Sequence, residues 1–293
     1  MYIPTADSFC AGAGLMDLGF LNAGVNVQSS LEIDPKCCKT LRKNFNHKVI
    51  EADICTQTVL DKAESDMYIF TYPCTKYSEL ADLHYTRTGD EIYLHCLRHL
   101  ALRRPEMYVL ENVPGMKKFP VVMEAMSKLP DYYINIFCPL DASNWLPQSR
   151  ERLIIIGTKK PFNISPPEQS IHKVRLMDII DEVPDMKIGH AVMQRINGVY
   201  RDKPIITDPN DPNAHAPTCL AHYSKDRGTR LVIDRSHPLG MRPYTVREFA
   251  RLQGVPDWFE FAGSENDAMR QIGNGVAIPV AEWIGKQAIK YFN

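Results

Sequence analysis

The sequence has 293 residues, of which 44% are hydrophobic and 24% are charged. These proportions are those of an ordinary globular enzyme, and they exclude a disordered or fibrous chain. The formal net charge of −1 gives no sign of the basic character that many nucleic-acid-binding proteins have.

Membrane, secreted and zinc-binding classes are also excluded by the sequence pattern. No window approaches the roughly 18 uninterrupted apolar residues of a membrane helix, and the first residues lack a secretory signal. The eight cysteines are scattered and form no CxxC pair. We therefore expect no disulfide framework, no metal site and a reducing compartment.

Residues 1–160 alternate short apolar runs with longer mixed segments, which is the rhythm of an α/β fold built from βαβ units. The expected strands are Tyr2–Phe9, Val25–Ile33, Val49–Glu51, Met67–Thr71, Met107–Glu111, Tyr133–Pro139 and Leu153–Thr158. The expected helices between them are Met16–Asn22, Pro35–Phe45, Asp90–Arg103 and Val121–Leu129.

The character of the sequence changes after residue 160. Prolines become frequent, and the stretch DPNDPNAHAP is typical of a surface loop. Helices are expected again at Val246–Leu252 and Pro279–Tyr291. We therefore predict a core in residues 1–160, a small irregular lobe in residues 161–240, and C-terminal helices in residues 241–293 that return to the core.

A glycine-rich turn follows the first expected strand, at Gly12 and Gly14. Glycine at such a turn lets the backbone approach a ligand that lies across the strand ends. Glu32 ends the second expected strand and Asp53 follows the third, where an acidic residue can hydrogen-bond ribose hydroxyls. This part of the sequence fits an S-adenosylmethionine site and a dinucleotide site equally well.

The ends of the fourth and fifth expected strands separate these two sites. Cys74 follows Pro73 and lies in a polar loop with Thr75 and Ser78, a setting where a thiolate can form and attack. The competing interpretation is a buried structural cysteine. Glu111 enters a turn directly from an apolar strand, where burial would raise its pKa and let it donate a proton near neutral pH.

Five sequence blocks resemble, in order and spacing, the motifs of the cytosine-5 DNA methyltransferase family. They are Pro73-Cys74 with Ser78, Glu111-Asn112-Val113, Gln148-Ser149-Arg150-Glu151-Arg152, Arg242–Asp257 and Gln271–Pro279. Agreement in order and spacing extends from residue 7 to residue 286. The resemblance implies a Rossmann-like methyltransferase fold with a small, irregular target-recognition lobe. It also implies the use of S-adenosylmethionine, with S-adenosylhomocysteine as product.

The resemblance also implies a mechanism. Cys74 would add to carbon 6 of a cytosine flipped out of duplex DNA while Glu111 interacts with N3, and carbon 5 would take the methyl group. Arg150 and Arg152 would hold the O2 atom of the base and the flanking phosphate. Asn112 would orient the cysteine loop through backbone hydrogen bonds.

The remaining expected site residues fall into two groups. The cofactor-binding residues are expected to be Phe9, Gly12, Gly14, Glu32, Ile33, Asp53, Ile54, Pro73, Asn274 and Val276. The DNA-binding residues are expected to be Ser78, Gln148, Arg195, Lys225, Arg227 and Arg230. Two simpler interpretations stay open: a tight turn with Asn274 in the left-handed region, and a merely solvated surface at residues 225–230.

The sequence departs from the family pattern near the expected chemistry. The glycine turn continues with Leu15 where a third glycine is usual, Thr75 replaces the usual Gln, and Tyr72 is bulkier than the usual residue. Only about residues 165–216 remain for target recognition. Recognition is therefore expected to be short, shape-based, or helped by a second protein chain.

Three alternatives remain. A tRNA cytosine-5 methyltransferase belongs to the same family, but no extra basic or aromatic segment suits single-stranded bases. A non-catalytic nucleic-acid-binding paralogue would not need Cys74, Glu111, Arg150 and Arg152 together. A Rossmann oxidoreductase leaves the Pro-Cys block unexplained. We expect a restriction-modification enzyme acting on duplex DNA, in the cytoplasm of a bacterial or phage-infected cell or in a eukaryotic nucleus, without a membrane partner.

Overall fold

The structure is a computed structural model, and it describes residues 1–59, 65–73, 92–168, 173–198, 201–202, 204–225 and 227–293. Internal contacts divide the chain into two units. Unit 1 comprises Met1–Asp141, Glu151–Pro167 and Val280–Asn293, and unit 2 comprises Ala142–Arg150 and Glu168–Pro279.

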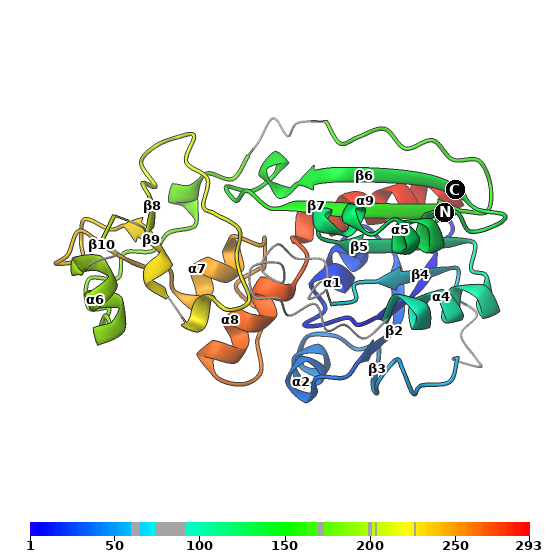
Figure 1. Ribbon diagram of the computed structural model, residues 1–293, viewed down its shortest axis with the longest axis horizontal. Helices are drawn as coiled ribbons and strands as arrows, with labels where there is room; N and C mark the ends of the chain where they lie inside the picture. The colour runs from blue at the N-terminus through cyan, green and yellow to red at the C-terminus, as the bar shows by residue number, and fades with distance from the viewer. Residues whose placement is uncertain (60–64, 74–91, 169–172, 199–200, 203, 226) are drawn as a thin grey trace. The chain divides into compact units, whose positions relative to one another are not determined.

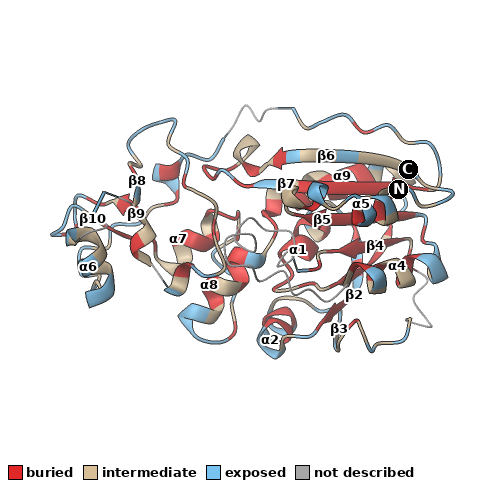
Figure 2. Ribbon diagram, viewed as in Figure 1, coloured by how far each residue is buried: buried red, intermediate tan, exposed pale blue. Residues whose placement is uncertain are grey.

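Unit 1 is built on a seven-stranded sheet with the order β3-β2-β1-β4-β5-β7-β6 (Figure 1). Its strands are β1 (Thr5–Phe9), β2 (Asn26–Glu32), β3 (Lys48–Glu51), β4 (Met67–Phe70), β5 (Met107–Asn112), β6 (Tyr133–Asp141) and β7 (Glu151–Thr158). Strands β1 to β5 pair in parallel, and β7 pairs antiparallel with both β5 and β6. β4 and β5 are buried along their whole length, which explains why both contain continuous apolar runs (Figure 2).

Helices cover both faces of this sheet. They are α1 (Leu15–Asn22), α2 (Pro35–Asn44), α4 (Ile92–Arg103), α5 (Pro120–Ser127) and α9 (Ile278–Phe292). On one face, α4 and α5 contribute side chains to an apolar cluster that includes Leu110 and Ile155. Phe137 pairs with Ile154, whose side chain points to the opposite face from that of its neighbour Ile155. Trp283 of α9 contacts Phe137, so α9 covers this other face. The unit is therefore a doubly wound α/β layer structure.

The parallel order places the carboxyl ends of β1, β2, β3, β4 and β5 along one edge of the sheet, where ligands bind in such folds. Helix α2 shows how the sequence fixes this edge. The Asp34 side chain accepts hydrogen bonds from the backbone N–H groups of Lys36 and Cys37, and Pro35 takes the first helical position. The expected strands and helices of unit 1 that fall on described residues are present, with ends that differ by a few residues.

The described residues of unit 2 form a three-stranded sheet with the order β10-β9-β8, together with the α-helices α6, α7 and α8. Its elements are α6 (His190–Asn197), β8 (Ile205–Thr207), β9 (Arg230–Ile233), β10 (Met241–Pro243), α7 (Val246–Arg251) and α8 (Glu265–Asn274). Short 3-10 helices complete the described elements of the chain: Pro114–Lys118, Ala142–Asn144, Leu176–Asp178, Tyr223–Lys225 and Arg227–Thr229.

A buried ion triad holds unit 2 together. The Arg242 side chain has no exposed surface; its Nε donates to Asp234 at 2.6 Å and its Nη2 donates to Glu248 at 2.7 Å. Glu248 also accepts the backbone N–H of Asp181 at 2.9 Å. Charges buried this deeply need such complete pairing, so the triad fixes the start of α7 against β9 and β10.

The boundaries of the units differ from the predicted segments. Residues 241–279, which include α7 and α8, lie in unit 2, and Val280–Asn293 alone lies in unit 1. The Arg242–Glu248 pair explains this difference, because it ties α7 to the sheet of unit 2. Among the described helices, none is long and apolar enough to cross a membrane.

Candidate active site

The two glycines of the turn after β1 let other groups come close to the backbone. Gly12 has φ +56° and Gly14 has φ +80°, a region that favours glycine. A Cβ atom on Gly12 would meet nothing within 4 Å, so open space lies above this backbone. A Cβ atom on Gly14 would lie 2.5 Å from the ring of Phe45, so this glycine lets α2 come close.

Glu32 at the end of β2 fixes the glycine turn. Its Oε2 accepts the backbone N–H of Gly12 at 2.7 Å, and its Oε1 accepts those of Ile33 and Asp34 at 2.9 and 2.8 Å. Burial raises the pKa of Glu32, while these backbone hydrogen bonds act in the opposite direction. Ile33 beside it is 61% exposed, so its apolar side chain is accessible to a ligand.

The loop after β3 holds the next expected residues. The Oδ1 atom of Asp53 accepts the backbone N–H of Cys55 at 2.8 Å, and Ile54 is buried. Arg98 of α4 donates to the carbonyl oxygens of Ile54 and Gln57 at 3.0 and 2.7 Å. Arg98 therefore anchors this loop, and it was missed by the sequence analysis because a helical arginine at this position has no distinguishing pattern.

Phe9 differs from its expected role. The ring has no exposed surface, and its centroid lies 5.0 Å from those of both Tyr68 and Phe70. A side-chain contact with a cofactor is therefore not available to Phe9 in this structure. The reason is its position on β1, an interior strand of a sheet covered on both faces.

Cys74 and Ser78 lie outside the described residues, which resume at Ile92 after Pro73. The segment that leads to Cys74 is held by Asn112, whose Nδ2 donates to the carbonyl oxygen of Tyr72 at 3.2 Å. The Oδ1 atom of Asn112 also accepts the backbone N–H of Val113 at 2.9 Å. One amide thus joins the end of β5 to the residue before Pro73.

Glu111, at the end of β5, carries an ion pair. The Nε atom of Arg152 lies 2.9 Å from its Oε1, and the two side chains are only 14% and 10% exposed. The antiparallel pairing of β7 with β5 brings these two strand positions together. An almost enclosed carboxylate held by a guanidinium can accept a hydrogen bond from a polar ligand at this edge and so orient it.

Other described cysteines do not share the setting expected for Cys74. Burial raises the pKa of the Cys10 and Cys96 thiols and raises that of Cys38 to about 12. A thiol with a raised pKa is a poor nucleophile at neutral pH, so a structural role fits these three residues.

In unit 2, Gln148 is placed differently from the expected DNA contact. Its side chain has no exposed surface, its Nε2 donates to the carbonyl oxygen of Leu252 at 2.6 Å, and its Oε1 accepts the backbone N–H of Cys219 at 2.8 Å. Both ends of the amide therefore bind protein backbone. In this structure a duplex cannot reach Gln148.

Arg150 is also placed differently from the expected contact with a base or phosphate. The side chain is 1% exposed, and its guanidinium donates to the carbonyl oxygens of Cys219, Gly273 and Gly275 at 2.7 to 2.9 Å. These bonds fasten the segment around Cys219 to the end of α8. The geometry favours a positioning role for Arg150 over direct contact with substrate.

The Gly273-Asn274-Gly275 segment forms the end of α8 and not a tight turn. Asn274 is its exposed last residue and is absent from the described residues with positive φ. A Cβ atom on Gly273 would lie 2.3 Å from the backbone nitrogen of Ala221, so glycine is required there for close contact. Val276, just beyond the helix, is buried.

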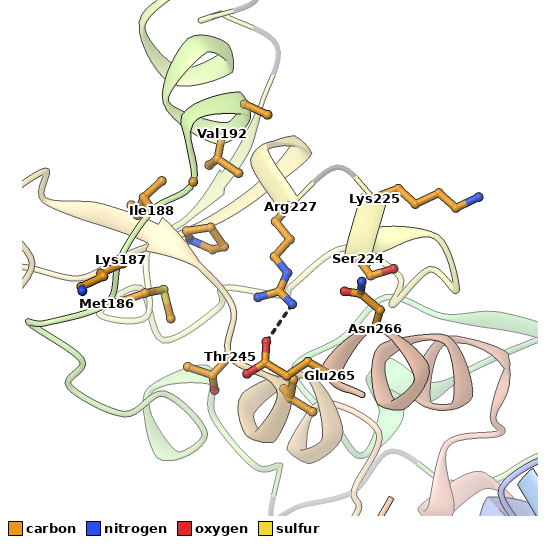
Figure 3. A pocket seen from close by; sticks show the side chains of 14 residues that line it. Met186, Lys187, Ile188, Val192, Ser224, Lys225, Arg227, Thr245, Glu265 and Asn266 are labelled. Atoms are coloured by element: carbon orange, nitrogen blue, oxygen red, sulfur yellow. Dashed lines mark hydrogen bonds and ion pairs between the residues drawn. The ribbon is translucent and has the colours of Figure 1, made fainter. Parts of the chain in front are cut away.

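Two of the four expected basic residues of unit 2 line one hollow, shown in Figure 3. Lys225 and Arg227 line it, and Arg227 pairs with Glu265 at 3.0 Å. Arg195 packs its side chain against Gly228, and Arg230 donates to Thr229 at 3.3 Å. Among the described residues, no group of three or more His, Cys, Asp or Glu side chains is arranged to hold a metal ion.

Comparison with known proteins shows to which family the chain belongs. The family model of the C-5 cytosine-specific DNA methylase matches residues 5–187 and 167–290, nearly the whole chain. The chain belongs to the C-5 cytosine-specific DNA methylase family. Membership makes the chain a cytosine-5 DNA methyltransferase and implies S-adenosylmethionine as its methyl donor.

Relatives of this methylase carry matching names. The type II methyltransferase M.Sau96I of Staphylococcus aureus is 29% identical over 97% of this chain and 75% of its own length. The type II methyltransferase M.NlaX of Neisseria lactamica is 27% identical over 94% of this chain and 93% of its own length.

Solved structures show the same fold. A putative DNA modification methyltransferase encoded within an E. coli prophage superposes with a TM-score of 0.74 at 23% identity, covering 99% of each chain. A Spodoptera frugiperda DNMT2 superposes with a TM-score of 0.80 at 17% identity, covering 98% of this chain and 99% of its own. The methylase therefore has the Rossmann-like fold predicted from its sequence.

The residues at the strand ends of this methylase fit S-adenosylmethionine. The open space above Gly12 would admit a ligand against the backbone. The exposed Ile33, next to Glu32 in the chain, offers an apolar surface for a flat ring, and Asp53 follows the neighbouring strand β3. A nucleoside with an aromatic base and ribose hydroxyls is the chemistry that such a set of groups can bind.

Proposed function

We propose that this methyltransferase acts on a cytosine flipped out of duplex DNA, with Cys74 as nucleophile and Glu111 at N3 of the base. The observation that carries the proposal is the Glu111–Arg152 ion pair at the end of β5, next to Asn112 and its bond to Tyr72. A flipped base is required because carbon 5 of cytosine cannot be reached inside a duplex.

Cys74 starts the reaction. Its thiolate adds to carbon 6 of cytosine, the electron pair moves through the ring toward N3, and carbon 5 becomes nucleophilic. S-Adenosylmethionine, when bound, supplies the methyl group that carbon 5 receives. The carbon-5 proton then leaves to a base, and the Cys74 thiolate is eliminated as the ring double bond is restored.

Glu111 makes the addition possible by donating the proton of its neutral carboxyl form to N3, where negative charge would otherwise develop, and takes that proton back when the Cys74 thiolate is eliminated. Arg152 contacts the Glu111 carboxylate through its Nε, which fixes the direction in which this carboxyl group points. Its Nη1 donates to the carbonyl oxygen of Glu151 at 2.7 Å, so Nη2 is the group proposed to donate to the O2 atom of the base. Arg152 thus serves as both a positioning group and a donor.

Asn112 and Arg150 act at one remove from the base. Asn112 holds the backbone of Tyr72, two residues before Cys74, so it positions the nucleophile. Arg150 holds the end of α8, where Asn274 and Val276 are expected to border the cofactor. Gly12, Gly14, Glu32, Ile33, Asp53, Ile54 and Pro73 are the proposed cofactor-binding residues in unit 1.

The test is methyl transfer from tritiated S-adenosylmethionine to mixed duplex DNA and, in parallel, to total tRNA. Wild type and Cys74→Ser are compared, and cofactor binding is measured for both. Label that enters DNA with the wild type and is lost with Cys74→Ser supports the proposal. Label in tRNA alone would show that the substrate is RNA and not DNA. Undiminished labelling by Cys74→Ser would refute the role of Cys74.

A further inference from the structure

Unit 2 contains a hollow with a volume of about 530 Å³, within the range of binding pockets. It is lined by the segment before α6 and the start of α6, by residues 224, 225 and 227, by the turn between β10 and α7, and by the start of α8 (Figure 3). Its apolar lining includes Met186, Ile188 and Val192, and its polar lining includes Lys187, Lys225, Arg227 and Glu265. Three cations and one carboxylate among these residues favour an anionic ligand.

The Arg227–Glu265 pair is the distinctive chemical feature of this hollow. The Nη2 atom of Arg227 lies 3.0 Å from Oε2 of Glu265, and Figure 3 shows the two side chains pointing toward each other. The Arg227 side chain is 27% exposed and that of Glu265 is 72% exposed. An ion pair this open contributes little to folding stability, so stability alone gives no reason for placing it in a pocket.

This pair sets hydrogen-bond donors directly beside an acceptor. In the major groove of DNA, guanine presents the acceptors O6 and N7, which a guanidinium binds with two parallel hydrogen bonds. The cytosine paired with that guanine presents the N4 amino donor, which a carboxylate accepts. The Arg227–Glu265 pair therefore matches the edge of one G·C base pair in both chemistry and order.

We propose that Arg227 and Glu265 together read one G·C base pair of the target duplex, while Lys187 and Lys225 bind phosphates on either side. This proposal rests on the proposed function, because the ligand is the DNA that the enzyme methylates. It assigns base recognition to the turn before β9 and the first residue of α8, outside residues 165–216, the segment expected for recognition. Lys187 and Lys225 are both exposed, as contacts with the DNA backbone require.

The experiment is a methylation assay on a library of randomised duplexes, with sequencing that identifies each methylated cytosine and its neighbours. Wild type is compared with Arg227→Ala and with Glu265→Ala. We expect both variants to lose selectivity at the same single G·C position, by roughly 5- to 150-fold. Lys187→Ala and Lys225→Ala should instead weaken binding to all sequences. Each should also reduce the slope of the logarithm of the binding constant against the logarithm of salt concentration by about one.

A matched control is the exposed Arg42–Glu51 pair of unit 1, which has a similar distance of 2.8 Å and does not line the hollow. Arg42→Ala should leave the sequence preference unchanged. Unchanged selectivity in Arg227→Ala and Glu265→Ala, or a uniform loss of activity without a change at one position, would overturn the inference. A wild-type enzyme that labels no DNA would instead refute the proposed function, so the two failures are distinguishable.

Discussion

The Nε atom of Arg152 lies 2.9 Å from Oε1 of Glu111, with both side chains almost enclosed. Neutralising the carboxylate removes the group proposed to act at N3, and general acid–base groups contribute about 10²- to 10⁴-fold to rate. We expect Glu111→Gln to lower the rate of methyl transfer by that factor while S-adenosylmethionine still binds. Single-turnover kinetics with saturating cofactor measure the effect, and a loss of less than threefold would contradict the role of Glu111.

Gly12 and Gly240 offer a matched pair of variants. Both have positive φ, +56° and +67°, and a Cβ atom on either would meet nothing within 4 Å. Alanine should therefore cost each variant about 1–2 kcal/mol of folding free energy. Gly12→Ala alone should also weaken S-adenosylmethionine binding, because its methyl group enters the space proposed for the cofactor. Calorimetric titration of both variants checks this, and equal affinities would contradict the placement.

Arg98 is expected to control cofactor affinity without touching the cofactor. Arg98→Met removes the hydrogen bonds to the carbonyl oxygens of Ile54 and Gln57 and frees the loop that carries Asp53. The Kd for S-adenosylmethionine should rise about tenfold or more, since hydrogen bonds from charged groups are worth about 1.5–3 kcal/mol each. The control is Arg42→Gln, which breaks an exposed ion pair with Glu51 at the end of β3 and should leave Kd unchanged. A similar Kd for both variants would show that Arg98 has no such role.

His99 should make stability depend on pH. Burial, with Arg98 nearby, lowers the pKa of His99 to about 4. Between pH 4 and about 6.5 the unfolded chain therefore binds a proton that the folded chain does not, and stability falls as pH falls through this window. The expected loss is about 3 kcal/mol. Urea unfolding at several pH values gives the free energy of unfolding as a function of pH. This free energy should change less steeply with pH for His99→Phe than for the wild type, and an identical pH dependence would contradict the assignment.

The sequence predicted unit 1 well because its elements carry strong local signals. Continuous apolar runs identify β4 and β5, and Asp34-Pro35 marks the start of α2. Unit 2 was predicted less completely. Its strands have only three or four residues, too few to establish a period, and α8 was not expected although it has a capping box at Ser264.

The sequence did not allow us to predict which polar side chains of the site are buried. Gln148 and Arg150 belong to a motif that suggests contact with substrate. In the structure, both side chains instead form hydrogen bonds with backbone carbonyl and amide groups of unit 2. Their partners, such as Leu252 and Gly273, lie more than 100 residues away in the chain. Such long-range hydrogen bonds leave no periodic or compositional trace, and the same holds for the buried triad of Arg242.

The most direct test of the account is covalent capture of Cys74 by its substrate. A duplex with 5-fluorocytosine at the methylated position cannot release the carbon-5 substituent after methyl transfer, so the bond between sulfur and carbon 6 should persist. With S-adenosylmethionine present, we predict a denaturant-stable protein–DNA adduct for the wild type, a tryptic peptide containing Cys74 attached to the base, and no adduct for Cys74→Ser. An adduct that forms equally with Cys74→Ser, or attachment at another cysteine, would contradict the central claim.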